Sequence, residues 1–471
     1  MYTQATRRMF FRSSGLGLAG VALPSLLDQE VTAASPSTPY SPKQPHIPAS
    51  AKNIIFMYQI GAPSQLDMFV PKPELNKRDG EPLPESYLER ANFAQIQDAR
   101  PALMGTPYKF KQHGEAGHWV SELMPHTAKI SDMISYVHSC EAEDTNHMFG
   151  ELHMNTGWRR FGRPSLGSWV LYGLGSESAN LPGFMVLRSG MHPRSKGANW
   201  GNGFLPATMQ GTPMQFSGSP IFNLDTPPGF PQSSQAATVR AINKLNRKRL
   251  FDNPDPSIEA RIASYELAFR MQSAAPELLD LSKESAATLQ MYGITDINAP
   301  SYARNCLLSR RLIERGVRFV EVFHGDWDHH TSIYQRLPNE CKTTDQGSAA
   351  LVIDLAQRGL LDDTLVIWGS EFGRSSVAQK SQMPGEPVGR DHHVKAFTMW
   401  FAGGGVKAGA SIGQTDDIGF DSITDKYHVH DLHATMLHAV GLDHEQLTYR
   451  HQGRDYRLTD IHGDVKHELF A

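Results

Sequence analysis

Aspartate and histidine side chains gather after an apolar run in the stretch RFVEVFHGDWDHH. This stretch places Asp326, Asp328 and His330 directly after residues 319–323. Carboxylate oxygens and imidazole nitrogens are ligands that suit zinc, manganese or iron better than calcium. A polar loop with capping aspartates is the structural alternative for one such motif alone.

Further residues of the same chemical types recur downstream. The segment LVIWGSEFGR supplies Glu371, GRDHH supplies Asp391 and His392, and HDLHATMLHAV supplies His433. Ten of the 21 histidines lie between His324 and His444. This recurrence after successive apolar runs favours a metal centre over a purely structural role.

Two other charged residues have two interpretations each. Arg374 is predicted to clamp an anionic oxygen or to pair with Glu371, and the two roles are compatible. Asp67 follows the glycine turn of GAPSQLD. It is predicted either to be a ligand carboxylate or to cap a turn or helix.

The pattern of apolar runs and helical periodicity predicts the elements that position these residues. Short apolar runs predict buried strands at 51–60, 134–137, 181–187, 318–323, 364–368 and 395–402. Helical spacing predicts helices at 119–134, 164–174, 302–316, 345–359 and 430–440. Such alternation predicts an α/β domain with a largely parallel sheet, and sheets of this kind bind ligands at the carboxyl ends of their strands.

The composition is that of an ordinary soluble protein and excludes some classes. The chain has 471 residues, 40% of them hydrophobic, and a net charge of −4. This charge argues against a general nucleic-acid binder. The three cysteines lie far apart, which excludes a zinc ribbon and a dense disulfide framework. One disulfide with a free cysteine and three free thiols are both compatible with the sequence.

The amino terminus has the three parts of an export signal. Two arginines and two phenylalanines precede an apolar run and a small-residue exit, so residues 1–34 are predicted to be a twin-arginine signal. An amphipathic helix of the mature fold is the alternative. Residues 35–50 are predicted to be a flexible linker, and 51–471 a single domain with a Gly/Pro-rich covering insertion near 189–234. We therefore expect a periplasmic or extracellular protein without a transmembrane segment in its mature chain.

Six stretches together resemble the family called domain of unknown function 1501. They are GAPSQLD, NHMFGELHMNTG, LLSRRLIERGVRFVEVFHGDWDHH, DLAQRGLLDDTLVIWGSEFGR, GRDHH and HDLHATMLHAVGLD. This family occurs in exported bacterial proteins and is grouped with alkaline phosphatases and sulfatases. The resemblance implies an alkaline-phosphatase-like fold with helices on both faces of the sheet. It also implies a site for one or two metal ions that acts on phosphate or sulfate esters.

The same resemblance assigns individual positions. In sulfatase-like proteins the nucleophile stands ten residues before the glycine of a Thr-Gly pair, and this position is His147 here. His147 is therefore expected to act as a general acid or base, or as a covalent nucleophile. The later Asp-x-His pattern is matched by Asp328 and His330, Asp391 and His392 come from the next loop, and His433 is expected to be the last imidazole.

Two functions follow from these patterns. The first is an exported hydrolase of an anionic phosphate or sulfate ester, small molecule or glycan, in which His147 and Arg374 act on the substrate. Its divalent ion, zinc with manganese or calcium as alternatives, would be bound by residues among Asp67, Asp326, Asp328, His330, Glu371, Asp391, His392 and His433. The second is a non-catalytic, metal-containing relative that binds an envelope glycan or protein, which the missing hydroxyl or thiol nucleophile favours. No oligomeric state follows from the sequence.

Overall fold

The computed structural model describes residues 40–214, 232–252, 256–380 and 385–471. These residues belong to a unit that spans 39–471. The predicted export signal at 1–34 lies outside the described residues, as does the part of the predicted insertion at 215–231.

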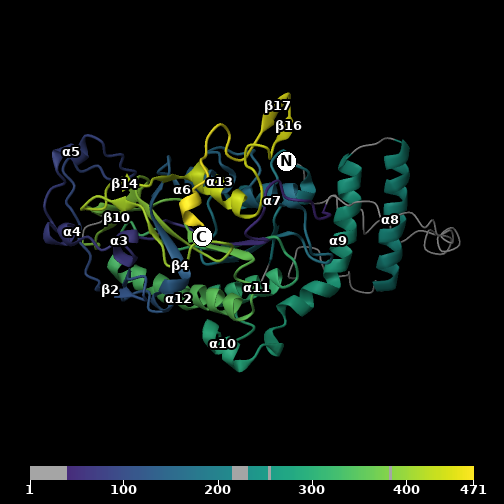
Figure 1. Ribbon diagram of the computed structural model, residues 1–471, viewed down its shortest axis with the longest axis horizontal. Coiled ribbons are helices and arrows are strands. Elements are labelled where there is room, and N and C mark those ends of the chain that lie inside the picture. Colours follow the sequence, from purple (N-terminus) through teal and green to yellow (C-terminus); the bar gives the residue numbers. More distant parts are fainter. Residues whose placement is uncertain (1–39, 215–231, 253–255, 381–384) are drawn as a thin grey trace. The chain divides into compact units, whose positions relative to one another are not determined.

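A nine-stranded sheet lies at the centre of this unit (Figure 1). Along the sheet the strands follow the order β12 (Ser411–Ile412), β4 (Ile134–Glu141), β11 (Phe397–Ala402), β8 (Thr364–Gly369), β1 (Asn53–Gln59), β7 (Phe319–His324), β5 (Phe184–Ser189) and β6 (Thr212–Pro213), and β15 (Tyr427–His428) also pairs with β4. Within this sheet, β11 is antiparallel to both of its neighbours and the other pairs are parallel. The predicted largely parallel sheet is confirmed.

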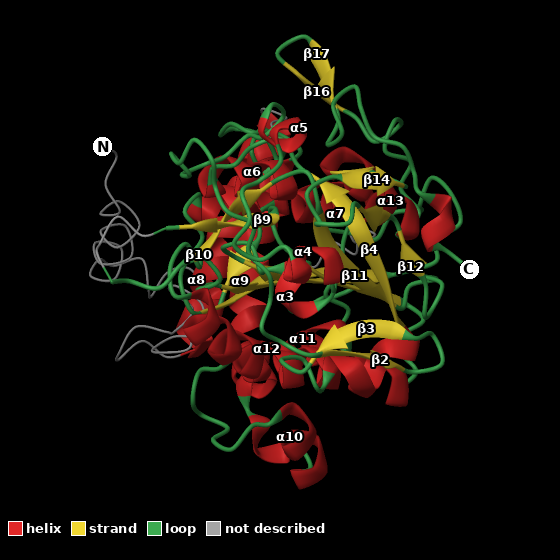
Figure 2. Cartoon of the chain, turned by 90° about the vertical axis from the view of Figure 1, so that its left-hand side faces the viewer, coloured by secondary structure: helices red, strands yellow, loops and turns green. Residues whose placement is uncertain are grey.

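Helices cover both faces of the sheet. Successive side chains of a strand point to opposite faces, so the buried strands contribute apolar side chains to two separate cores. In β1, Ile55 and Met57 pack in the core that contains residues of α11 (Tyr302–Ile313) and α12 (Ile333–Gln357). Ile54, Phe56 and Tyr58 pack in a second core, with residues of α7 (Leu166–Leu174) and α13 (Val429–Ala439). Figures 1 and 2 show the two helix layers on either side of the sheet. The predicted helix-covered α/β fold is therefore confirmed.

The remaining elements lie around this core. The helices are α3 (Gln65–Met68), α4 (Pro73–Lys77), α5 (Glu85–Leu88), α6 (His147–Thr156), α8 (Gln232–Asp252), α9 (Pro256–Leu279) and α10 (Ala286–Tyr292). Two-stranded sheets pair β2 (Phe110–His113) with β3 (His118–Ser121), β9 (Gly373–Gln379) with β10 (Gly389–His393), β13 (Gln414–Thr415) with β14 (Ser422–Thr424), and β16 (Tyr449–His451) with β17 (Arg454–Tyr456).

One predicted helix is wrong. Residues 119–134 have helical spacing of apolar side chains, but they form β3 followed by a 3-10 helix at Thr127–Met133. Pro125 lies between the two elements. Proline has no N–H for a helical hydrogen bond and disfavours helix in the residue before it, so a continuous helix does not form here.

The described part of the predicted linker is fixed to the domain. The main-chain N–H of Lys43 donates to Leu174 O at 2.9 Å, that of His46 donates to Gly441 O at 2.8 Å, and that of Ser50 donates to Ala439 O at 2.9 Å. Residues 40–50 therefore follow the ends of α7 and α13 rather than forming a free tether.

All three cysteines are buried and free, so three thiols, rather than a disulfide and one thiol, are present. Within the residues that the structure describes, every helix is too short or too polar to span a bilayer.

A buried acid in the sheet makes the stability of the fold depend on pH. Glu321 in β7 is 1% exposed, and burial raises the pKa of its carboxyl well above the usual value. The folded protein therefore keeps this proton to a higher pH than the unfolded chain, in which glutamate has a pKa of about 4.3. The protonated carboxyl of Glu321 stabilises the fold fully below the unfolded pKa, and this stabilisation falls as the pH rises towards the raised pKa.

We therefore expect Glu321→Gln to increase the free energy of unfolding at pH 8, measured in urea, and to have a smaller effect at pH 5. Glu115→Gln, in an exposed turn, serves as the control and should change stability little at either pH. An equal gain from Glu321→Gln at both pH values would contradict this account.

Candidate metal centre

The carboxyl ends of four strands lie at the same edge of the sheet. β1 is parallel to β7 and β8, and β4 has the direction of β8 because both are antiparallel to β11. Gly61 follows β1, Asp328 follows β7, Glu371 follows β8 and His147 follows β4. The topology therefore places polar residues that are distant in sequence in one region, as parallel sheets do.

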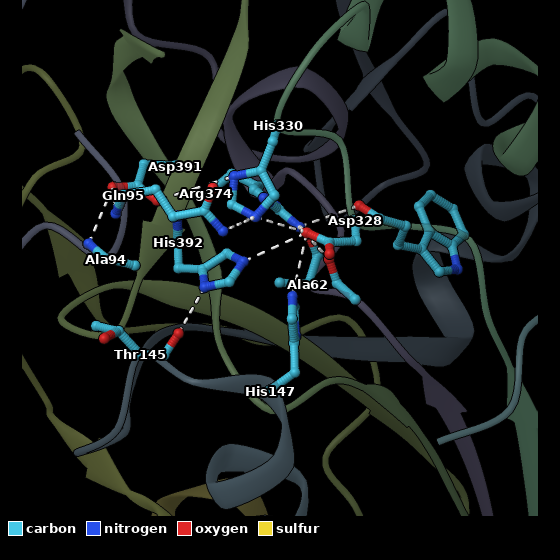
Figure 3. A network of polar contacts seen from close by, with 12 residues as sticks. Ala62, Ala94, Gln95, Thr145, His147, Asp328, His330, Arg374, Asp391 and His392 are labelled. Carbon is cyan, nitrogen blue, oxygen red and sulfur yellow. Dashed lines mark hydrogen bonds and ion pairs between the residues drawn. The ribbon is translucent and has the colours of Figure 1, made fainter. Parts of the chain in front are cut away.

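Three imidazoles converge on one carboxylate oxygen at this edge (Figure 3). The Oδ1 atom of Asp328 lies 3.1 Å from His147 Nε2, 2.9 Å from His330 Nε2 and 3.3 Å from His392 Nε2. His147 is the first residue of α6, Asp328 and His330 follow β7, and His392 lies in β10. We call these four residues the Asp328 centre.

The other nitrogen of each ring faces a hydrogen-bond acceptor. His147 Nδ1 lies 2.7 Å from Glu371 Oε1, His392 Nδ1 lies 2.5 Å from Thr145 O, and His330 Nδ1 lies 2.5 Å from Gln379 Oε1. A carboxylate or carbonyl oxygen accepts only, so the Nδ1 atoms carry the protons. In the neutral rings the lone pairs are then on Nε2, the atoms that point at Asp328.

This arrangement fits a metal ion. Three nitrogen lone pairs facing an ionised oxygen repel one another unless a cation lies between them, and His147 Nε2 is buried without a hydrogen-bond partner. Tetrahedral zinc with bonds of about 2.0–2.1 Å separates its ligands by about 3.3 Å, close to the three measured separations. Acceptors on the second nitrogen of each imidazole are characteristic of metal-binding histidines.

The protonation of the centre also suits metal binding. Burial lowers the pKa of His392 to about 3, so this imidazole is neutral at pH 7. Burial alone would raise the pKa of Asp328, but hydrogen bonds from imidazole N–H groups and the charge of Arg374 hold the pKa well below the usual range. Burial alone would lower the pKa of His147, but Asp328 and Glu371 raise it, so an ion bound at its Nε2 would displace a proton. Neutral imidazole and ionised carboxylate are the forms that bind metal ions.

Arg374 fixes the loops around the centre. Its side chain is fully buried and donates to Ala62 O at 2.9 Å, to Arg390 O at 3.0 Å and to Gly61 O. It also donates to Asp328 Oδ1 at 2.7 Å. Most of its N–H groups are thus used on main-chain carbonyls and on the central carboxylate. We predicted that Arg374 clamps an anionic oxygen or pairs with Glu371, and in the structure its ion pair is with Asp328.

A second arginine lies at the exposed side of the centre. Arg194 Nη2 is 2.9 Å from Asp328 Oδ2, and half of its side chain is exposed. Its loop is anchored because the buried carboxylate of Glu151 accepts from the main-chain N–H groups of Arg194 and Ser195 at 3.0 and 2.9 Å. Arg194 was not among the site residues predicted from the sequence. The sequence feature that indicates a role for it is its position in the Gly/Pro-rich insertion, which we expected to cover the site.

Close backbone contact joins the β1 turn to the Asp328 loop. Gly61 has φ +107°, and a Cβ atom there would lie 2.6 Å from the main-chain nitrogen of Asp328. Only glycine adopts this conformation readily and leaves the required space. Asp326, two residues before Asp328, has φ +95°, and it is outside the group of converging side chains.

Three further predicted ligands have other partners in the structure. Both oxygens of Asp67 accept from the guanidinium of Arg390, at 2.8 and 3.2 Å, and both side chains are fully buried. Asp391 Oδ2 accepts from three consecutive main-chain N–H groups, those of residues 94–96, at 2.9–3.1 Å. His433 Nε2 lies 2.6 Å from Met154 O.

Glu371 lies one contact away from the converging atoms. Its Oε1 accepts from His147 Nδ1 and from the main-chain N–H of Gly61 at 2.9 Å, and its Oε2 from Ser370 Oγ at 2.7 Å. The structure thus brings Asp328, His330 and His392 together with His147, while Glu371 orients His147. Asp67, Asp326, Asp391 and His433 are not members of this group, although Asp391 Oδ1 lies 3.9 Å from His330 Nδ1.

The chain belongs to the family described as "Protein of unknown function (DUF1501)", which matches residues 51–470. This confirms the family predicted from the six motifs. A search of curated proteins gave no match.

Similar solved structures include a protein of the alkaline phosphatase superfamily from Vibrio parahaemolyticus, with 11% identity and a TM-score of 0.37, covering 88% of this chain and 72% of that one. The PsFucS1 sulfatase from Pseudoalteromonas sp. has 12% identity and a TM-score of 0.36, with 84% and 68% covered. An alkaline phosphatase from the Antarctic bacterium TAB5 has 10% identity and a TM-score of 0.34, with 84% and 99% covered.

The pairing of Asp67 with Arg390 generates a test of its role. Asp67→Asn leaves a buried guanidinium without its counter-charge, so we expect the free energy of unfolding to fall by about 3–5 kcal/mol, measured in urea. Metal content of the folded protein, measured by elemental analysis, should not change.

The matched control is Asp363→Asn, which breaks the exposed pair with Lys52 and should cost at most about 1 kcal/mol. Loss of bound metal from folded Asp67→Asn protein would show that Asp67 is a ligand after all.

Proposed function

We propose that this protein is a metal-dependent hydrolase of an anionic phosphate or sulfate ester. The observation that carries the proposal is the convergence of three imidazole Nε2 atoms and Asp328 Oδ1 beside the half-exposed Arg194. A bound divalent ion would supply Lewis acidity and lower the pKa of a coordinated water.

We propose zinc as the ion. Three nitrogens and one carboxylate oxygen at tetrahedral spacing match zinc better than calcium, which takes six to eight oxygen ligands. Manganese prefers oxygen-rich, octahedral sites, so three imidazoles favour zinc over manganese as well.

Arg194 is the residue that we assign to the substrate. Its main-chain N–H donates to Glu151, and its half-exposed side chain pairs with Asp328 through the guanidinium. A guanidinium matches the oxygens of a phosphate or sulfate group and forms charge-assisted hydrogen bonds with them. Arg374 would act through Asp328, by holding the carboxylate towards the ion.

His147 fits the role of a ligand better than that of a nucleophile. One nitrogen faces Asp328 and the other donates to Glu371, so neither is free to attack a substrate. We therefore propose that water attacks the phosphorus or sulfur atom, that the bond to the ester oxygen breaks, and that the departing alcohol takes a proton from this water.

The second candidate is a metal-containing binding protein for an envelope glycan or protein. The same observation on His147 favours it, because the position expected for a covalent nucleophile serves the metal centre instead. Both candidates place the protein outside the cytoplasm, which we propose from the twin-arginine pattern at residues 6–12.

Turnover of a panel of phosphate and sulfate monoesters and diesters by the zinc-loaded protein tests the proposal. Arg194→Ala should keep the bound metal but lower kcat/KM by about 10–100-fold, since a hydrogen bond to a charged group contributes about 1.5–3 kcal/mol. Asp328→Asn should lose both metal and turnover.

Arg450→Ala provides the control, because Arg450 lies in the exposed β16–β17 hairpin and should leave kcat/KM unchanged. Metal binding without turnover of any ester above the Asp328→Asn background would reject the hydrolase and favour the binding protein.

A further inference from the structure

A second group of histidines lies at the opposite end of α6 from His147. Ring nitrogens of His153, His428 and His430 all lie within 4.8 Å of one another. His153 belongs to the last turns of α6, His428 to β15, and His430 to the first turn of α13. His153 is six residues from His147, about 9 Å along the helix axis, so this group is separate from the Asp328 centre.

Two of these imidazoles have a buried nitrogen without a partner. His430 Nε2 lies 3.0 Å from Gly157 O, which can only accept, so the lone pair is on Nδ1. That Nδ1 atom is buried and makes no hydrogen bond, and the same holds for His153 Nδ1. His153 is 2% exposed and His430 is 5% exposed. Buried polar atoms are nearly always satisfied by a partner, so these two nitrogens indicate a bound ligand.

The third imidazole, that of His428, lies beside a carboxylate and lines a cavity. His428 Nε2 lies 3.4 Å from Glu143 Oε1, while the other oxygen of Glu143 pairs with Arg159. His428 also lines a cavity of about 420 Å³ with His462 and Asp464. An ion in this cavity therefore reaches the imidazole of His428.

We propose that His153, His428 and His430 bind a second divalent transition-metal ion, and that the carboxylate of Glu143 beside His428 supports this site. Three imidazoles form a ligand set that binds zinc in proteins. In the structure, His428 Nδ1 accepts from the main-chain N–H of His430 at 3.3 Å. If the ion binds at Nε2 of His428, the ring proton moves to Nδ1, and this hydrogen bond is lost.

The site has a structural role in this proposal. It joins the end of α6 to the start of α13 across the carboxyl end of β4, which pairs with β15. Because α6 also begins at the Asp328 centre, an ion here fixes the helix that carries His147. The proposal does not depend on the reaction proposed above.

Titration of the metal-free protein with Co²⁺, followed by visible absorption and by calorimetry, tests the proposal. We expect two equivalents for the wild type and one for His153→Gln and for His430→Gln. Glu143→Gln changes a residue whose side chain is 40% exposed and should fold normally. It should weaken the second site by about 10–100-fold, the range found when partners of metal sites are removed.

Two variants separate this site from the Asp328 centre. His438→Gln replaces a half-buried histidine of the same helix outside the cluster and should keep both equivalents. Asp328→Asn should lose one equivalent and keep the one that depends on His153. If Asp328→Asn keeps every equivalent and His153→Gln loses one, the proposed function fails and the second site stands.

The proposal is overturned if His153→Gln, His430→Gln and Glu143→Gln all bind Co²⁺ with the stoichiometry and affinity of the wild type. It is also overturned if the wild type binds one equivalent that Asp328→Asn abolishes. Circular dichroism of the metal-free variants checks that each one is folded before its titration is interpreted.

Discussion

The contact of three imidazoles with one oxygen of Asp328 is the interaction on which the proposed function depends. Each ring has its lone pair directed at the carboxylate because its Nδ1 atom is held by Glu371, Thr145 or Gln379. Such a set of acceptors is stable only around positive charge. Arg374 supplies part of that charge from the interior, and a metal ion would supply the rest.

The fold positions this centre by joining loops that are distant in sequence. Arg374 connects the β1 turn and β10 through main-chain carbonyls, and the Asp328 loop through the carboxylate of Asp328. Gly61 lets the β1 turn approach Asp328 to a distance that no side chain would permit. Asp67 and Arg390 form a second buried pair beside this network. Asp67, a carboxylate outside the Asp328 centre, therefore helps to fix the loops that position the centre.

The parts of the fold governed by local pattern could be predicted from the sequence. Strands such as β1, β7 and β8 are continuous apolar runs, and their carboxyl ends led directly to Asp328 and His330. The family motifs added His147. The helix predicted at 119–134 failed because a periodic pattern does not include the effect of Pro125.

The remaining site residues depend on contacts that spacing does not encode. Asp391 and His392 are adjacent in sequence, and the register of β10 shifts between Arg390 and His392. His392 faces Asp328, while Asp391 Oδ2 accepts from main-chain N–H groups of residues 94–96. Arg194 comes from a loop without periodicity, and the ligands at His153, His428 and His430 come from the ends of separate elements. Only the tertiary structure brings such residues together.

The most direct test of the Asp328 centre is X-ray diffraction from crystals of the zinc-loaded protein, collected on both sides of the zinc absorption edge. The account predicts an anomalous peak about 2 Å from the Nε2 atoms of His147, His330 and His392 and from an oxygen of Asp328. A map without a peak among these four side chains, from protein that binds zinc elsewhere or not at all, would contradict it.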